Sequence, residues 1–124
     1  MIAGNFGSKG ELLFEIELIA VNGNTFPVEA LLDTGFTSGW LAINIQDIEV
    51  FEWSLLERKR AMQTAKGEEF FDIYAGKVLL HGQEFIIPVI AGDELEESLL
   101  GLQWLKTMRL VVDFPAGVLT LGNS

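Results

Sequence analysis

The sequence predicts an all-β fold in a single domain that spans residues 1–124. Glycine is frequent, with 13 residues, whereas proline occurs only three times. Turn signals recur at short intervals along the chain, as expected for a protein built from hairpins. Several stretches alternate apolar with polar residues, which is the pattern of a strand with one buried face. A chain of 124 residues is long enough to form one hydrophobic core.

The first predicted hairpin begins at Glu11. Residues 14–18 read Phe-Glu-Ile-Glu-Leu, an alternation that predicts a half-buried strand. Asn22-Gly23-Asn24 is a typical hairpin turn, because Asn and Gly tolerate positive φ. The second strand runs from about Thr25 to Leu32. Its last three residues are apolar on both faces, so we expect it to end inside the core.

A polar loop bracketed by glycines follows at residues 33–39, and a short apolar strand is expected at 40–43. Residues 44–60 have no clear period. Within them, 54–60 fits a short helical turn capped by Ser54.

The remaining elements are three hairpins, an acidic loop and a short helix. In chain order they are a hairpin with its tip at Lys66-Gly67 that returns through 70–74, a hairpin of 77–80 and 84–91, an acidic loop at 92–98, an apolar segment at 99–101, a helix of about two turns at 102–108, and a hairpin of 109–114 and 118–121.

The composition limits the function classes. The net charge is −10, with 8 Lys and Arg against 18 Asp and Glu, so we expect no nucleic-acid partner and no membrane partner. The absence of cysteine excludes a disulfide framework, a thiolate zinc site and a cysteine nucleophile. No apolar run is long enough to cross a membrane and residues 1–10 lack the apolar core of a signal peptide, so the expected location is cytoplasmic.

One motif carries candidate chemistry. Asp33 directly follows the apolar strand end Leu31-Leu32 and is followed by Thr34 and Gly35. A carboxylate at the end of a buried strand is costly unless it is hydrogen-bonded, so it belongs either to a functional site or to a hydrogen-bonded turn. Taken alone, the tripeptide leaves these two interpretations open.

Two further segments follow at ordered positions: a glycine-tipped hairpin at 63–68 and Leu99-Leu100-Gly101 before the short helix. With these three features the chain resembles the retropepsin-like aspartic proteases, in particular their small prokaryotic single-domain relatives, from about Glu11 to Leu121. The resemblance implies a closed acid-protease β-barrel with a β-hairpin flap that covers the site.

The resemblance also implies an activity. In this family two aspartates hold one water and share one proton, because two adjacent carboxylates cannot both ionise. Since this chain has a single Asp-Thr-Gly, the pair must come from Asp33 of two copies, which predicts a C2 homodimer. The implied substrate is a peptide or an unfolded protein, and no metal or other cofactor is required.

Other roles follow from the same resemblance, residue by residue. Thr34 and Gly35 complete the catalytic loop, and Leu99, Leu100 and Gly101 support it from beneath. The predicted substrate-binding residues are Phe36 and Thr37 beside the loop, together with Ala65, Lys66 and Gly67 at the flap tip.

The chain also departs from the family pattern. Phe36 replaces a small residue, and its ring would fill a subsite, narrow the cleft or turn into the core. Thr37 and Ser38 replace aspartates, and Leu102-Gln103 replaces a pair whose arginine helps tie the subunits together. These departures support an alternative function, a catalytically silent peptide-binding or dimerisation module. A third hypothesis is a monomer that needs a different chain to complete its cleft.

Overall fold

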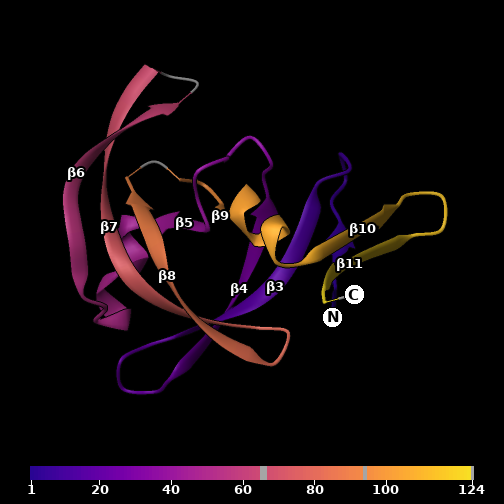
Figure 1. Cartoon of the computed structure of the whole chain (residues 1–124), viewed down its shortest axis with the longest axis horizontal. Helices are drawn as coiled ribbons and strands as arrows, with labels where there is room; N and C mark the ends of the chain where they lie inside the picture. The colour runs from indigo at the N-terminus through magenta and orange to yellow at the C-terminus, as the bar shows by residue number, and fades with distance from the viewer. Residues whose placement is uncertain (65–66, 94, 124) are drawn as a thin grey trace.

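The computed structural model describes residues 1–64, 67–93 and 95–123. Short 3-10 helices (η) interrupt a chain that is otherwise mainly strand (Figure 1). The elements are β1 (Ile2–Ala3), β2 (Asn5–Phe6), β3 (Leu12–Ile19), β4 (Thr25–Leu32), β5 (Leu41–Asn44), η1 (Ile45–Asp47), η2 (Glu49–Phe51), β6 (Leu55–Thr64), β7 (Gly67–Leu80), β8 (Gln83–Gly92), β9 (Ser98–Leu100), η3 (Leu102–Lys106), β10 (Arg109–Asp113) and β11 (Val118–Gly122).

The larger sheet closes into a barrel, as predicted. Its strand order is β2-β3-β4-β9-β5-β8-β7-β6, and an extra pairing of β3 with β7 joins its two halves. That closure places Glu17 opposite Leu79 and Leu18 opposite Val78. Two pairings are parallel, β4 with β9 and β5 with β8, and the others in this sheet are antiparallel. The short strand β9 therefore lies between the strands that flank the 33–39 loop.

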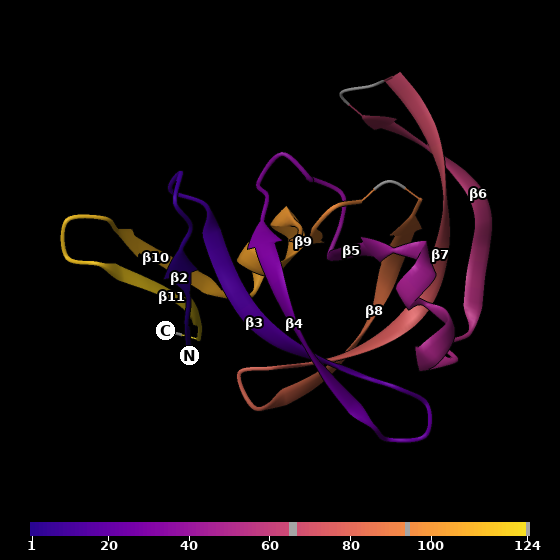
Figure 2. The same cartoon turned by 180° about the vertical axis from the view of Figure 1, so that it is seen from behind.

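A second sheet contains β1, β11 and β10 in that order. The β10–β11 hairpin projects from the barrel on the side away from the β6–β7 hairpin (Figures 1 and 2). Its register is continuous from Arg109 opposite Gly122 to Asp113 opposite Val118. The hairpins predicted at 11–32, 77–91 and 109–121 are confirmed by these pairings.

The core fills the barrel and extends under the second sheet. Trp104 is completely buried and makes edge-to-face contacts with Trp40 and Phe85. Trp53 stacks on Phe51 at 4.5 Å, and its Nε1 donates a hydrogen bond to the carbonyl oxygen of Ile19 at 2.8 Å. The indole N–H groups are thus paired where the rings are buried, which removes the cost of burying them.

The helical turn expected at 54–60 is wrong. These residues begin strand β6, and the helical turns η1 and η2 lie earlier, before residue 52. The strand is irregular at its start, with register shifts between Leu55 and Glu57 and between Glu57 and Arg60. Pairing with the long strand β7 overrides the local helical signal, because a hairpin gains its hydrogen bonds from the partner strand.

The helix predicted at 102–108 is present but shorter, as the 3-10 helix η3. It ends where Thr107 and Met108 both donate backbone hydrogen bonds to the carbonyl oxygen of Trp104. Its buried Trp104 anchors the turn, and the chain then leaves directly into β10. No helix among the described residues is long and apolar enough to cross a membrane.

Candidate active site

The parallel pairing of β4 with β9 positions Asp33. Leu32 lies opposite Leu100 in this pairing, and the backbone N–H of Asp33 donates to the Leu100 carbonyl oxygen at 2.9 Å. The Asp33 side chain is partly exposed. Its Oδ1 accepts a hydrogen bond from the Gly35 N–H at 2.9 Å, which fixes the carboxylate at the rim of the loop. Asp33 thus lies in a hydrogen-bonded turn. These contacts alone do not distinguish a structural turn from a functional site.

The loop of residues 33–39, here called the Asp33 loop, is tied to the segment that follows β9. The Leu102 N–H donates to the Phe36 carbonyl oxygen at 3.0 Å, and the Gln103 N–H donates to that of Gly39 at 3.3 Å. Just beyond the loop, the Gly101 N–H donates to the Trp40 carbonyl oxygen at 2.9 Å. The Asp33 loop is therefore held by backbone groups of one other segment, which limits how far Asp33 can move.

Two glycines allow this segment to lie against the loop. A Cβ on Gly101 would lie 1.9 Å from the carbonyl oxygen of Gly39, and a Cβ on Gly39 would lie 1.8 Å from the ring of Phe36. Real Cβ atoms do not approach other atoms so closely. Glycine is therefore required at position 101, where the backbone lies against the backbone of Gly39, and at position 39, where the backbone lies against the Phe36 ring.

The Phe36 ring packs inward. It lies on Gly39 and Gly101 and joins a small cluster around the buried Ala42, Ile73 and Ile90. Of the three orientations open to this ring, the structure has the one in which it turns toward the core. The ring remains partly exposed, so its predicted contact with substrate stays a prediction.

Gln103 has a contact that sequence reasoning missed. Its Nε2 donates to the carbonyl oxygen of Thr37 at 2.7 Å, within the same protomer. The sequence marked Gln103 only as a departure from the family pattern. Its proximity to Thr37 depends on two segments that are 66 residues apart in the chain, and no local signal could have indicated it.

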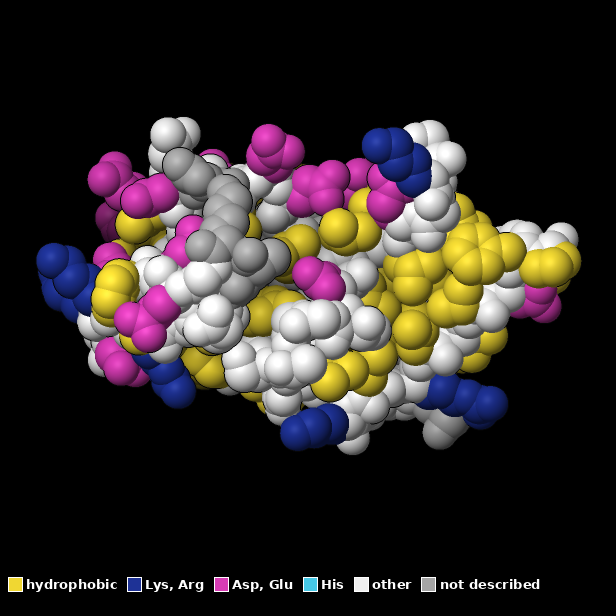
Figure 3. Space-filling view, turned by 90° about the horizontal axis from the view of Figure 1, so that it is seen from above, with side chains coloured by type: hydrophobic (Ala, Val, Ile, Leu, Met, Phe, Trp, Pro, Cys, Tyr) yellow, Lys and Arg dark blue, Asp and Glu magenta, His cyan; other side chains and the backbone are white. Residues whose placement is uncertain are grey.

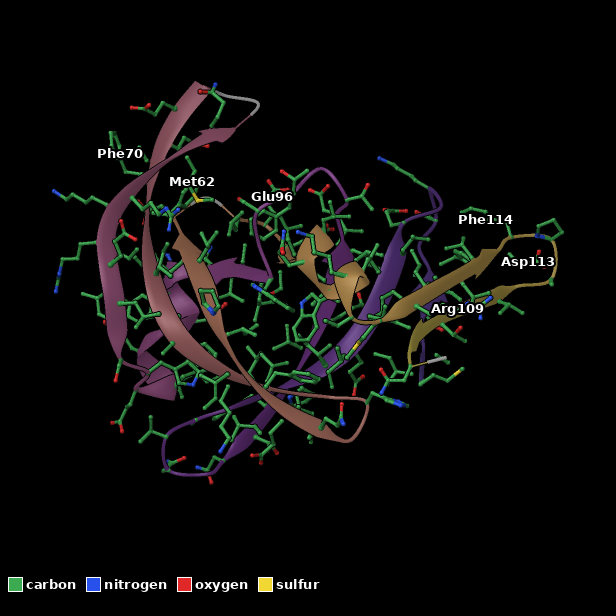
Figure 4. The ribbon with its side chains drawn as sticks, viewed as in Figure 1. Met62, Phe70, Glu96, Arg109, Asp113 and Phe114 are labelled. Carbon is green, nitrogen blue, oxygen red and sulfur yellow. The ribbon has the colours of Figure 1, made fainter. Side chains whose placement is uncertain are left out.

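The β6–β7 hairpin is the predicted flap. Thr64 pairs with Gly67 at its end, and Gly67 has φ of +106°, with open space where a Cβ would be. The predicted substrate-binding residues Ala65 and Lys66 lie outside the described residues. Met62 lies on the side of the hairpin that faces the barrel cluster containing Phe36, whereas Phe70 is 62% exposed on the other side (Figure 4).

A small pocket of about 80 Å³ lies between the flap and the Asp33 loop. Apart from Arg60, Ser38 and Gly39, its lining residues are apolar. The residues are Ser38, Gly39, Trp40, Arg60, Met62, Ile73, Pro88 and Ile90. A larger pocket of about 480 Å³ is lined by residues outside the Asp33 loop, namely Ile45, Lys59, Phe70, Asp72, Ala91 and Asp93. The smaller pocket is the one whose lining includes residues of the Asp33 loop.

One protomer supplies one loop aspartate. The hydrogen bonds and ion pairs among the described residues join no other carboxylate to Asp33. Asp93 and Asp113 are exposed, and Asp113 Oδ1 accepts from the Ala116 N–H at 3.1 Å in the last hairpin. Within the described ranges, no three His, Cys, Asp or Glu residues gather closely enough to hold a metal ion. Thr34 and Gly35 are exposed beside Asp33.

No family model and no curated protein matches the sequence. Solved structures do match. A retropepsin-like aspartic protease from Rickettsia conorii superimposes with a TM-score of 0.65 at 21% identity, covering 98% of this chain and 89% of that one. The EIAV protease, in complex with the inhibitor HBY-793, superimposes with a TM-score of 0.60 at 15% identity, covering 87% of this chain and 99% of that one.

The chain has the retropepsin-like fold. The match extends over nearly the whole chain, so the retropepsin-like fold includes the flap hairpin, the Asp33 loop and the segment at 99–101. At these identities the likeness establishes the fold, and the activity has to be argued from the residues of the site.

Proposed function

We propose that this protein is an aspartic endopeptidase that acts as a homodimer, with a water held between the Asp33 carboxylates of two copies. One observation carries the proposal. In a retropepsin-like fold, Asp33 stands at the end of a buried strand, held by the Leu100 carbonyl oxygen and the Gly35 N–H, with a flap hairpin and an adjoining pocket.

The reaction needs only the two carboxylates and the water. Two carboxylates that share one proton provide one general base and one general acid. The charged Asp33 takes a proton from the water as its oxygen bonds to the scissile carbonyl carbon, and the neutral Asp33 gives its proton to the carbonyl oxygen. Collapse of the tetrahedral diol then breaks the C–N bond, as a proton passes to the leaving nitrogen.

The rest of the site orients and shields this chemistry. Backbone hydrogen bonds from Leu102 and Gln103 fix the Asp33 loop, so each carboxylate is positioned before substrate arrives. Gly67 lies at the end of the flap, which covers the bound peptide and excludes water. The pocket beside the loop, lined by Trp40, Met62 and Ile90, suits an apolar substrate side chain.

One observation favours the alternative function, a silent peptide-binding or dimerisation module. Leu102 stands where the family carries the arginine that helps tie the subunits together, and its side chain has no polar group for such a contact. Gln103 next to it donates a side-chain N–H to Thr37 of its own protomer. A weak dimer would leave each Asp33 without its partner, and the protein would then bind peptides without cleaving them.

Cleavage of casein between pH 3 and 8, with and without pepstatin, tests the proposal. The variant Asp33→Asn keeps an oxygen for the Gly35 N–H and should fold, but it should lose all cleavage. Asp93→Asn is the matched control, because Asp93 is an exposed aspartate outside the Asp33 loop, and it should cleave like the unmodified protein. Absence of cleavage by a folded dimer would favour the silent module, and cleavage that survives in Asp33→Asn would refute the mechanism.

A further inference from the structure

A β-bulge lies in β6 at the base of the flap hairpin. The register of β6 against β7 shifts between Glu57 and Arg60, where β6 has one residue more than β7. Arg58 and Lys59 therefore lie opposite the single residue Asp72. Lys59 has φ of +51°, a left-handed conformation that a residue with a Cβ adopts only when its surroundings hold it there. The bulge therefore needs a contact that stabilises it.

The Asp72 carboxylate provides that contact. Its Oδ1 accepts a hydrogen bond from the Lys59 N–H at 3.1 Å. Carboxylate acceptors make stronger hydrogen bonds than neutral acceptors do. Asp72 and Lys59 also line the larger pocket, of about 480 Å³, so the bulge faces open space rather than the packed core. The hydrogen bond, rather than packing, is therefore the contact that holds Lys59 in its left-handed conformation.

Asp72 lies where the flap hairpin leaves the barrel. From Asp72, which is opposite Ala91, to Leu80, strand β7 pairs with β8. In the described part of the chain, residues 67–71 pair only with β6. Asp72 is thus anchored to the barrel while it holds the bulge of the neighbouring strand. A change of register at the bulge would be carried to the rest of β6, because a shift by one residue exchanges the two faces of a strand.

The bulge decides which side chains of β6 face the pocket beside the Asp33 loop. Arg60 and Met62 are two residues apart on the same face of β6, and both line that pocket. Figure 3 looks onto this end of the molecule and shows hydrophobic side chains exposed beside the flap hairpin. Without the extra residue the faces of β6 would exchange, and Lys59 and Ala61 would line the pocket instead. The pocket would then lose the methionine side chain on one of its walls.

The ion pair between Arg60 and Glu57 reflects the same geometry. Residues three apart on a regular strand point to opposite faces. The extra residue of the bulge brings Arg60 and Glu57 to the same face, where Nη1 of Arg60 lies 3.5 Å from Oε2 of Glu57. The pair is exposed and therefore adds little to stability, but it could not form across a strand without the bulge.

We propose that Asp72 is a positioning residue of the candidate active site, because its carboxylate maintains the bulge at Lys59. The bulge in turn keeps Arg60 and Met62 on the wall of the pocket beside the Asp33 loop. This inference rests on the proposed function in one respect, namely that the pocket receives a substrate side chain. The register of β6 can be measured without any cleavage, so the inference and the proposed function can be tested separately.

The methionine methyl signals in an NMR spectrum report the register of β6. The chain has three methionines, and Met62 is the one in the flap hairpin. Met62 packs in the same apolar cluster as the rings of Phe36 and Phe71, which displace its methyl signal from the position of an exposed methionine. Met108 is buried in the main core and serves as an internal control. Asp72→Ala should therefore move the Met62 signal toward the exposed position and leave the Met108 signal unchanged.

Rescue variants separate the hydrogen bond from a general loss of stability. Asp72→Asn keeps an oxygen that accepts from the Lys59 N–H, so the Met62 signal should stay in place. In the Asp72→Ala background, Lys59→Gly should return the signal, because glycine adopts positive φ without a steric penalty. Lys59→Ala in the same background is the matched control and should not return it, because alanine keeps the penalty. A Met62 signal that returns with both second changes, or with neither, overturns the inference.

Lys59→Val tests the bulge from the other strand. The variant leaves Asp72 intact, but a β-branched residue disfavours positive φ more strongly than lysine does. The Met62 signal should therefore move as it does in Asp72→Ala, and an unmoved signal overturns the inference. This variant decides the question if Asp72→Ala also displaces the Met108 signal and so proves to be misfolded.

Casein cleavage by the same variants tests the link to the proposed function. Asp72→Ala should raise KM by about tenfold or more with little change in kcat, and Lys59→Gly in that background should restore KM. A moved Met62 signal with an unchanged KM overturns the positioning role. If the unmodified protein does not cleave casein but the Met62 signals follow the expected pattern, the register inference stands and the peptidase fails. Cleavage with unchanged KM and an unmoved Met62 signal overturns the inference and leaves the peptidase standing.

Discussion

Gly101→Ala tests how the Asp33 loop is held. The added Cβ would lie 1.9 Å from the carbonyl oxygen of Gly39 and 2.9 Å from the Phe36 ring. Since the first neighbour is backbone, the two segments must separate by more than an ångström to reach an allowed contact. That separation weakens the hydrogen bonds from Leu102 and Gln103 to the Asp33 loop, which are 3.0 and 3.3 Å long.

The magnitude follows from these contacts. Forcing extra volume into packed structure costs about 1–3 kcal/mol. Each weakened hydrogen bond costs about 0.5–1.5 kcal/mol more. The free energy of unfolding should therefore fall by about 2–6 kcal/mol, which is a large part of the 5–15 kcal/mol typical of a domain. With a urea m value of about 1.5 kcal/mol/M, the unfolding midpoint should fall by about 1.3–4 M.

Gly82→Ala is the matched control. Gly82 lies at φ +72° with open space around its position, so alanine there costs only the left-handed backbone penalty of about 1–2 kcal/mol. Urea unfolding of both variants at equal protomer concentration measures the difference, because a dimer's stability depends on concentration. If Gly101→Ala loses no more stability than Gly82→Ala, the close approach to Gly39 does not constrain the Asp33 loop.

Three further changes probe the loop, the core and one surface carboxylate. Gln103→Ala removes the hydrogen bond to Thr37 and should lower the free energy of unfolding by only about 0.5–1.5 kcal/mol. It should also reduce the rate of casein cleavage. An unchanged cleavage rate would show that the contact does not position the Asp33 loop. Trp104→Phe removes the hydrogen bond to the Trp40 carbonyl oxygen and leaves unfilled space in the core. Urea unfolding should therefore show that the free energy of unfolding falls by about 2–4 kcal/mol. A fall below about 1 kcal/mol would contradict the packing described. The pKa of Glu11 is lowered by backbone N–H groups that its carboxylate accepts from, first its own and then that of Lys9. Because the folded-state pKa is below the unfolded one, the stabilisation is present above about pH 4.3 and is lost as the pH falls through the folded pKa. Glu11→Gln should therefore destabilise at about pH 6, and the difference from the unmodified protein should shrink as the pH falls through the folded pKa. An NMR titration that finds an ordinary pKa would refute this.

Much of the fold is readable from local sequence. Alternation at 14–18, the turn at 22–24 and the turn at 81–82 predict hairpins that the structure contains. These elements can be predicted because a strand with one buried face must alternate apolar with polar residues, and because few residues tolerate the backbone of a tight turn. The structure of residues 54–60 could not be predicted from their sequence, because their extended form depends on pairing with β7 rather than on their own residues.

The candidate site likewise has features that the sequence predicts and features that it does not. Asp33 could be singled out because a carboxylate after an apolar strand is costly unless it is hydrogen-bonded, whereas the roles predicted for Thr34 and Gly35 came only from the family resemblance. Where the Phe36 ring lies was not identifiable, because all three of its possible positions suit a phenyl ring equally well. The ring turns inward because Gly39 and Gly101 leave room for it.

The sequence by itself therefore determined the all-β class, the hairpins and the loop that carries Asp33. Only the tertiary structure decided that β9 lies between β4 and β5, that Gln103 bonds to Thr37, and that the Asp72 carboxylate accepts from the Lys59 N–H. The reason is physical. Alternation and turn preference are properties of neighbouring residues, whereas strand order and backbone close approach depend on which distant segments share one barrel.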